Sequence, residues 1–490
     1  MRSATAPRRS PTPVNPPPLV DRSKTIRHIR ALIWLYLILL VFEGALRKWI
    51  VPQYSNPLLI VRDPVVIAIY MLALRARIFP FNRYVISLGV IAVLSMIASM
   101  LSPYVPLKPL AEVTLYGFRS NFLHLPLIFV MGTVMDEDDV KKIGWWILIG
   151  MIPMSLIMVA QFKAAPDSFI NRTVGLGEAQ QLTAGGGKIR PPGTFSFISG
   201  PVFYASVATA FVIYGALSRA TYKFWLLVAS AVALVIAVAV SGSRGCVASA
   251  LLVVGAILVI LLFKPKAVNQ FGKVLVIVVI GTLVISRLPI FKEGTDILSE
   301  RFTSSAEAAD TTVVRGMIDR TISGFTEGLT HLDQPPLLGY GLGIGTAGGA
   351  RFLIGRGAFL LTENEWTRVL LESGPILGLT FLLWRTALTL RLGYLSIVLL
   401  RRGTILPILL FASGFVALLN GQLGQPTNLG FAAFLSGLCL AATQVKKPDV
   451  DAGSPSVIEE PVPRRIPRRS DYASRLHGGS PDQTNGFVDR

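Results

Sequence analysis

The sequence predicts an all-α, polytopic membrane protein with about 12 transmembrane helices and one long loop outside the cytoplasm that contains an amphipathic helix. Hydrophobic residues make up 52% of the 490-residue chain and charged residues only 15%, whereas soluble domains carry about 25% charged residues. Several windows of about 20 residues contain few or no charges, and this length crosses the hydrocarbon core of a bilayer.

The two ends of the chain differ from its apolar middle. Residues 1–30 are rich in Pro and Arg and lack an apolar core, so we expect a disordered cytoplasmic arm rather than a cleaved signal peptide. Residues 446–490 are polar, include PRRIPRR, and are expected to form a disordered cytoplasmic tail. Cys246 and Cys439 both fall in apolar segments, so no disulfide framework is implied.

Hydropathy divides the middle of the chain into two groups of spans. Residues 31–288 are expected to form transmembrane helices 1–9 and residues 366–445 to form helices 10–12, with residues 289–365 as the long loop between them. The individual spans are expected at 31–50, 57–74, 84–102, 119–135, 143–161, 199–217, 224–240, 246–263, 272–288, 366–384, 404–421 and 428–443.

The basic residues indicate how the chain is oriented. Both termini and the loops at 75–83, 218–223 and 264–273 are basic, and with about 12 spans they all fall on one face. Basic loops face the cytoplasm, so both termini are expected there. This distribution accounts for much of the net charge of +19 without a nucleic-acid partner. It places the long loop 289–365 and the short break at 241–245 on the opposite face.

The long loop is the largest segment expected outside the membrane. Ser304 followed by Glu307 matches a capping box, and apolar side chains follow at helical spacing, so we expect an amphipathic helix lying over the membrane domain. The apolar positions are Val314, Met317, Ile318, Thr321, Ile322 and Phe325. The glycine run GYGLGIG at 339–345 follows no strand and opens no helix, so we expect a tightly turned loop rather than a dinucleotide fingerprint.

Three arginines are candidates for binding an anion on the outer face. Arg244 stands in AVAVSGSRGCVASALL (237–252), where it either snorkels to the interface or exposes its guanidinium to a phosphate beside small neighbours. Arg190 opens RPPGTFSF, whose prolines stiffen the entry to the sixth span. Arg315 lies in the expected outer helix, where it either binds an anion or forms a surface ion pair with Asp319.

A cluster of acidic residues lies at the entry to the tenth span, in LTENEWTRVLLESGPILGL (361–379). Either Glu363 or Glu365 could accept a proton from a hydroxyl held near cationic groups, or both could be ordinary interfacial residues. Arg368 and Glu372 lie one turn apart, which favours an internal ion pair over a catalytic role.

The remaining charged residues near the expected spans fall into two pairs, and the histidines are not expected to form a metal site. Arg62 with Asp63, and Glu112 with Arg119, are interpreted as charge pairs at membrane mouths, with the lining of a cavity as the alternative. No metal and no other cofactor is expected, because the histidines show no metal-ligand spacing. They are His28, His124, His331 and His477.

These motifs follow one another in a specific order. A span ends in SGSRG, a cytoplasmic loop and another span follow, and a long outer loop then carries a helical arginine. PLLGYGLG comes next, and then an acidic entry to a span with ExxG-type glycines. This arrangement resembles the bacterial O-antigen ligase and O-antigen polymerase superfamily, over about residues 190–400.

The resemblance implies metal-independent, inverting glycosyl transfer on the periplasmic face of a bacterial inner membrane. The family moves a glycan from undecaprenyl diphosphate to a sugar hydroxyl on lipid A–core or on another lipid-linked glycan, so the implied partners are that donor, that acceptor and membrane lipids. Arg244 and Arg315 would bind the diphosphate, and Arg190 matches a less specific family position. Ligases carry a His-Asn pair where this chain has Glu363-Asn364, so ligase, O-antigen polymerase and exopolysaccharide polymerase all remain open.

Two other classes of function remain as alternatives. A secondary transporter or a flippase for an envelope lipid or solute would also combine about 12 spans with intramembrane charges, although the sequence shows no repeated halves. A structural scaffold for envelope assembly would need none of the arginines named above.

Overall fold

The computed structural model describes the greater part of the chain between residues 22 and 444. The described residues are 22–106, 108–174, 183–185, 187–218, 221–264, 292–297, 299–300, 303, 324–328, 330 and 335–444. The expected span 272–288, most of the expected loop helix and the C-terminal tail therefore lie outside the described residues. Residues 22–30, which composition assigns to the arm, are already helical.

The first part of the chain forms a series of helices broken by short irregular turns. In order they are α1 (Arg22–Ala45), η1 (Leu46–Ile50), η2 (Pro52–Tyr54), α2 (Ser55–Leu58), α3 (Asp63–Arg75), α4 (Arg83–Met100), α5 (Leu110–Phe118), η3 (Arg119–Leu123) and α6 (Leu127–Val134). The span expected at 119–135 is therefore divided between the π-helical turn η3 and α6, with Pro126 between them.

In the rest of the described chain, the regular structure is also helical apart from one small hairpin. The helices are α7 (Glu137–Lys163), η4 (Phe169–Asn171), α8 (Ser199–Leu217), α9 (Phe224–Val240), α10 (Arg244–Phe263), α14 (Ala347–Ile354), α15 (Glu365–Arg401), α16 (Leu406–Asn420) and α17 (Pro426–Ala441). Strands β1 (Thr183–Gly185) and β2 (Lys188–Ile189) pair antiparallel. The all-α class is confirmed for the described residues.

Several of these helices are suited to cross a membrane. Seven are long and apolar enough: Arg22–Ile50, Pro52–Arg75, Arg83–Met100, Glu137–Lys163, Ser199–Leu217, Arg244–Phe263 and Glu365–Arg401. Three apolar helices are shorter: Phe224–Val240, Leu406–Asn420 and Pro426–Ala441. The protein is thus a multi-pass membrane protein, while the number of 12 spans stays a prediction.

Local sequence signals explain where several helices begin. Asn82 accepts hydrogen bonds from the backbone N–H groups of Tyr84 and Val85 and so caps α4. Asp136 and Asp139 form a reciprocal capping box at the start of α7. Both caps satisfy backbone donors that the first helical turn leaves without an intrahelical partner.

The helices pack around α8, α16 and α17, which are the most enclosed part of the bundle. Helix α16 packs on α8, α15 and α17, and α17 also contacts α6. Glycines permit these close approaches: a Cβ at Gly414 would lie 2.7 Å from Leu435 Cβ, and one at Gly437 would lie 2.4 Å from Met131 Sδ. The centre of the bundle is therefore closely packed.

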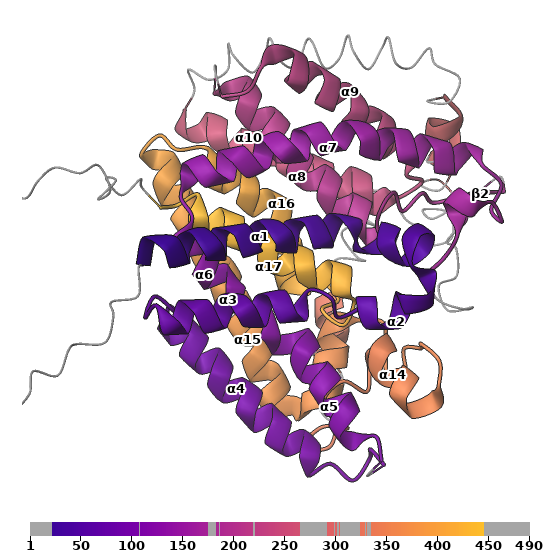
Figure 1. The fold of residues 1–490 in the computed structure, drawn as a ribbon, viewed down its shortest axis with the longest axis vertical. Coiled ribbons are helices and arrows are strands. Elements are labelled where there is room, and N and C mark those ends of the chain that lie inside the picture. Colours follow the sequence, from indigo (N-terminus) through magenta and orange to yellow (C-terminus); the bar gives the residue numbers. More distant parts are fainter. Residues whose placement is uncertain are drawn as a thin grey trace, which may run out of the picture. The chain divides into compact units, whose positions relative to one another are not determined.

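One end of the bundle carries most of the irregular structure. The β1–β2 hairpin, α2 and α14 lie at this end, whereas α1 begins at the opposite end (Figure 1). Arg351 of α14 donates a hydrogen bond to the side chain of Asn56 in α2. We refer to this end, at which the hairpin, α2 and α14 lie, as the hairpin end.

Candidate functional site

At the hairpin end, Arg190 lies beside the turn that leads into α10 at Arg244. Arg244 is the first residue of α10, directly after the tight turn that follows α9. Gly242 makes this turn with φ +55°, and a Cβ placed on it would lie 2.7 Å from Ala184 Cβ and 3.7 Å from Arg190 Cγ. The β1–β2 hairpin thus packs directly on the α9–α10 turn, and Arg190 Nε is held by the carbonyl oxygen of Thr183 at 3.1 Å. Two arginines far apart in sequence share one small region.

The first turn of α10 adds a second source of positive potential. The N–H groups of a helix's first turn point outward, and the helix dipole makes this end attractive to anions. Arg244 lies at this N-terminus and Arg190 beside the preceding turn. We call these two residues, with the N-terminus of α10, the arginine site.

Replacing Gly242 with valine is expected to displace the hairpin from the arginine site. A β-branched residue at φ +55° is strained, and its Cβ would collide with Ala184. We expect a loss of about 1–2 kcal/mol of stability, with faster hydrogen exchange of the amides in β1 and β2. Gly255→Val is the matched control, because a Cβ at Gly255 meets nothing within 4 Å. Equal exchange in the two variants would contradict this packing.

The described pieces of the long loop contact strand β2, the end of α9 and the start of α15. Lys188 of β2 forms an ion pair of 3.2 Å with Glu293, and a Cβ at Gly294 would lie 2.9 Å from the carbonyl oxygen of Ala239, near the end of α9. Further along the loop, Phe325 packs edge-on against Trp366 with 4.8 Å between ring centroids. Arg315, the third predicted anion ligand, lies outside the described residues.

The two acidic candidates, Glu363 and Glu365, have very different surroundings. Asn364 between them caps α15 by accepting from Trp366 N at 3.1 Å, and its amide donates to Glu327 Oε2 at 3.0 Å. The Glu363 side chain is exposed, and its backbone oxygen accepts from Gln422 Nε2 at 2.6 Å. Glu365 is 2% exposed and points into the bundle.

Buried arginines hold the Glu365 carboxylate. Its Oε2 pairs with Arg368 Nε at 2.9 Å and its Oε1 with Arg385 Nη1 at 2.7 Å. The backbone N–H of Leu423 donates to the same Oε1 at 3.2 Å. Arg385 is fully buried and also donates to the carbonyl oxygens of Leu418 and Gly421. Glu365 is therefore an integral part of a buried ionic network.

A break in α15 makes this network possible. Gly374 has φ +76°, and Pro375 follows it, so the helix reverses at this point rather than running straight. The segments before and after the break lie alongside each other, which lets Arg385 reach Glu365 across the reversal. A Cβ at Gly374 would lie 2.2 Å from the carbonyl oxygen of Leu337, so only glycine fits here. The span expected at 366–384 is therefore not one straight helix.

The network continues from α15 to η3. Arg368 pairs with Glu372 at 2.5 Å, as their spacing predicts, and donates to Asn121 Oδ1 at 2.9 Å. The backbone N–H of Gly345 donates to Glu372 Oε1 at 2.9 Å. We call Asn121, Glu365, Arg368, Glu372 and Arg385 the α15 network. Its two arginines balance its two glutamates.

A second buried ionic cluster joins α1, α3 and η3. Glu43 pairs with Arg47 and Arg62, each at 3.2 Å, while Asp63 pairs with Arg119 at 2.5 Å and with His124 at 2.9 Å. The expected pairs Arg62–Asp63 and Glu112–Arg119 do not form: Arg62, Asp63 and Arg119 pair with residues of other elements, and Glu112 is exposed. Glu43 and Arg47 lie one helical turn apart, whereas helix packing selects the partners Glu43–Arg62, Asp63–Arg119 and Asp63–His124.

The turn η3 connects the two clusters. Arg119 faces Asp63, and Asn121, two residues later, faces Arg368. Single π-helical turns widen a helix locally and occur often at functional sites. Among the described residues, no group of three or more His, Cys, Asp and Glu side chains could hold a metal ion.

The sequence did not identify Glu43, Arg47, Asn121 or Arg385 as members of the candidate site. A usable signal was present for Arg385, which is a single charge inside the apolar stretch FLLWRTALTL. Such a charge requires a buried partner, although the sequence does not indicate which one.

Comparison with known proteins does not assign the chain to a family. No protein-family model matches the chain, and a search of curated proteins finds no significant relative.

Proposed function

We propose that the protein is a membrane glycosyltransferase that acts on the periplasmic face of a bacterial inner membrane. It moves a glycan from a polyprenyl-diphosphate carrier to a sugar hydroxyl, as a ligase or a polymerase. The observation that carries this proposal is that Arg190 lies beside Gly242 in the α9–α10 turn, which is two residues before Arg244 at the N-terminus of α10. The hairpin end would then face the periplasm.

The arginine site matches the chemistry of a diphosphate leaving group. When the bond between the anomeric carbon and the phosphate oxygen breaks, the electron pair goes to the diphosphate, which gains negative charge. A guanidinium donates two parallel hydrogen bonds to phosphate and stays protonated. Donors fixed in place before the reaction stabilise such charge without reorganisation. Arg315 is proposed to contribute a third guanidinium from the long loop.

Glu363 is the better of the two candidate bases. Glu365 is buried and paired with Arg368 and Arg385, so its carboxylate is engaged in holding the fold together. Glu363 is exposed at the start of α15, where an acceptor sugar can reach it. In the proposed reaction the acceptor hydroxyl attacks the anomeric carbon, its proton passes to Glu363, and the configuration inverts.

Purified protein supplied with a polyprenyl-diphosphate glycan and a sugar acceptor is expected to form the transferred glycan. Glu363→Gln is expected to lower kcat by about 10²–10⁴-fold, since it removes the base. Glu112→Gln is the matched control, because Glu112 is also exposed and lies in the first turn of α5. Full activity in Glu363→Gln would overturn the role of the base, and no transfer by the wild-type protein would overturn the function itself.

A transporter or flippase is the second candidate, and the break in α15 favours it. Discontinuous helices and buried charges are typical of secondary transporters, and α15 has a break at Gly374 and a buried charge at Arg385. Proteoliposomes distinguish the two candidates. A transporter moves solute or lipid across the bilayer without consuming a lipid-linked donor, whereas the glycosyltransferase consumes the donor without net transport.

A further inference from the structure

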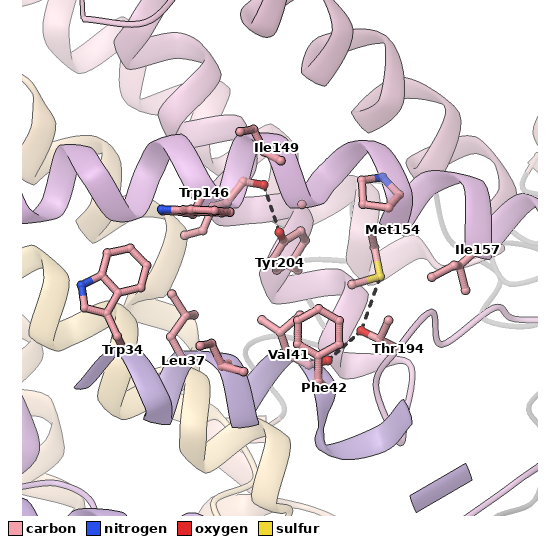
Figure 2. Close-up of a pocket in the computed structure, with 14 residues that line it drawn as sticks. Trp34, Leu37, Val41, Phe42, Trp146, Ile149, Met154, Ile157, Thr194 and Tyr204 are labelled. Atoms are coloured by element: carbon pink, nitrogen blue, oxygen red, sulfur yellow. Dashed lines mark hydrogen bonds between the residues drawn. The ribbon is translucent and has the colours of Figure 1, made fainter. Parts of the chain in front are cut away.

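The end of α1 packs directly on the segment that follows Arg190. A Cβ at Gly44, in the last turn of α1, would lie 2.2 Å from the backbone carbonyl carbon of Phe195, so only glycine allows this approach. Figure 2 shows Thr194 beside Val41, to whose carbonyl oxygen its hydroxyl donates at 2.6 Å. The backbone after Arg190 is therefore in close contact with the first helix.

Lys48 of the π-helical turn η1 holds this segment by two backbone carbonyl groups. Its Nζ donates to the carbonyl oxygen of Gly193 at 2.7 Å and to that of Phe195 at 2.8 Å. Lys48 is only 1% exposed. Because water cannot replace a hydrogen bond that a buried ammonium group loses, displacement of either carbonyl group is costly. Lys48 therefore fixes the backbone at both residues.

The same backbone forms a tight turn that α7 holds from a second side. Phe195 N donates to the carbonyl oxygen of Pro192 at 3.1 Å, and Gly193 inside the turn has φ +60°. Gln161 of α7 accepts from Gly193 N through its Oε1 at 2.8 Å. Its Nε2 donates to the carbonyl oxygen of the same glycine at 3.2 Å. The turn is therefore fixed by η1 and by α7.

Two prolines join this turn to Arg190. Pro191 and Pro192 stand between Arg190 and Gly193, and their rings hold φ at about −65°. A proline also restricts the backbone of the residue before it, which here is Arg190 itself. The connection is therefore short and stiff, so a turn fixed at Gly193 limits where the backbone of Arg190 can lie.

We propose that Lys48 is a positioning residue for Arg190. The inference rests on the proposed function, which assigns Arg190 to the diphosphate of the lipid carrier. Lys48 acts through the turn rather than on the anion: it holds the two carbonyl groups, and the prolines pass this position on to the arginine. A guanidinium that is already in place binds its anion without reorganisation. Gln161 supports the same turn from α7.

A double-mutant cycle on the purified full-length protein, with equilibrium binding of undecaprenyl diphosphate as the measurement, tests the proposal. Lys48→Met is expected to raise the dissociation constant about tenfold, and Arg190→Ala at least as much. The double variant is expected to bind like Arg190→Ala alone, because a residue that acts through another adds nothing once that residue is removed. A loss of folded protein would lower the number of binding sites without changing the dissociation constant. Effects that add in the double variant would overturn the proposal.

A second variant and a matched control accompany Lys48→Met. Gln161→Leu removes both side-chain bonds from α7 to Gly193 and is expected to weaken binding in the same way, even if Lys48→Met does not fold. Lys264, directly after the end of α10, also donates to a backbone carbonyl oxygen, that of Gly403. Lys264→Met is expected to bind like wild type, and equal losses in the two lysine variants would overturn the assignment.

Hydrogen exchange separates this proposal from the proposed function. Lys48→Met is expected to speed exchange of the Gly193 and Phe195 amides about tenfold, whereas Lys264→Met is expected to leave it unchanged. If the wild-type protein does not bind undecaprenyl diphosphate, the proposed function fails, while faster exchange in Lys48→Met leaves the hold of Lys48 on the turn standing. Unchanged exchange in Lys48→Met would overturn the positioning role with or without binding.

Discussion

Arg244→Lys is expected to lower the rate of glycosyl transfer by at least about 100-fold, the cost of losing one fixed donor to a developing oxyanion. Lysine keeps the charge at the first residue of α10 but loses the planar fork that donates two parallel hydrogen bonds to phosphate. Because the fork acts on charge that grows as the sugar leaves, kcat is expected to fall more than KM rises. Transfer from a polyprenyl-diphosphate glycan by purified protein measures both constants.

The matched control for this variant is Arg351→Lys. Arg351 also lies at the hairpin end, in α14, but its guanidinium is hydrogen-bonded to Asn56 rather than placed at the arginine site. It is expected to retain nearly full activity. If Arg244→Lys and Arg351→Lys were equally active, a positive charge alone would be sufficient, and the hydrogen-bonding fork would have no role.

Arg385→Leu is expected to produce the largest loss of stability among the changes considered. Arg385 is fully buried and is bonded to Glu365 and to two backbone carbonyl groups at the end of α16. Removing one partner of a buried ion pair leaves the other charge undercompensated, at a cost of about 3–5 kcal/mol. We expect a lower midpoint of thermal unfolding in detergent, measured by the loss of the monodisperse peak on size exclusion.

Arg391→Leu is the control for this effect. Arg391 is exposed on the same helix and makes a cation–π contact with Tyr394, so its replacement is expected to change stability by less than about 1 kcal/mol. Arg385→Lys is expected to recover part of the loss, because lysine restores the charge but not the three bonds of the guanidinium. A thermal midpoint for Arg385→Leu equal to that of Arg391→Leu would show that the network does not hold α15 in place.

Hydropathy predicted a multi-pass membrane protein, and seven helices of the described residues are long and apolar enough to cross a bilayer, because a spanning helix satisfies its backbone hydrogen bonds internally and exposes apolar side chains to lipid. It could not predict the reversal of α15. Gly374 and Pro375 are visible in the sequence, but whether they kink or reverse a helix depends on the packing of Leu337 against the break. An average over a window of 20 residues does not contain this information.

The sequence predicted individual residues of the candidate site and one ion pair within a helix, but not the ion pairs that join separate helices. The spacing of Arg368 and Glu372 indicated their ion pair, because both lie on one helix. The pairing of Glu43 with Arg62 and of Asp63 with Arg119 joins separate helices, so it depends on tertiary structure. In the same way, a tight turn at Gly242 is readable from sequence, but the hairpin that brings Arg190 to it is not.

The central claim is that the arginine site binds the diphosphate of a lipid carrier, and equilibrium binding of undecaprenyl diphosphate to purified protein tests it most directly. We predict that wild-type protein binds this lipid and that the double variant Arg190→Lys/Arg244→Lys binds it at least about tenfold more weakly. Equal affinity in the two proteins would contradict the account.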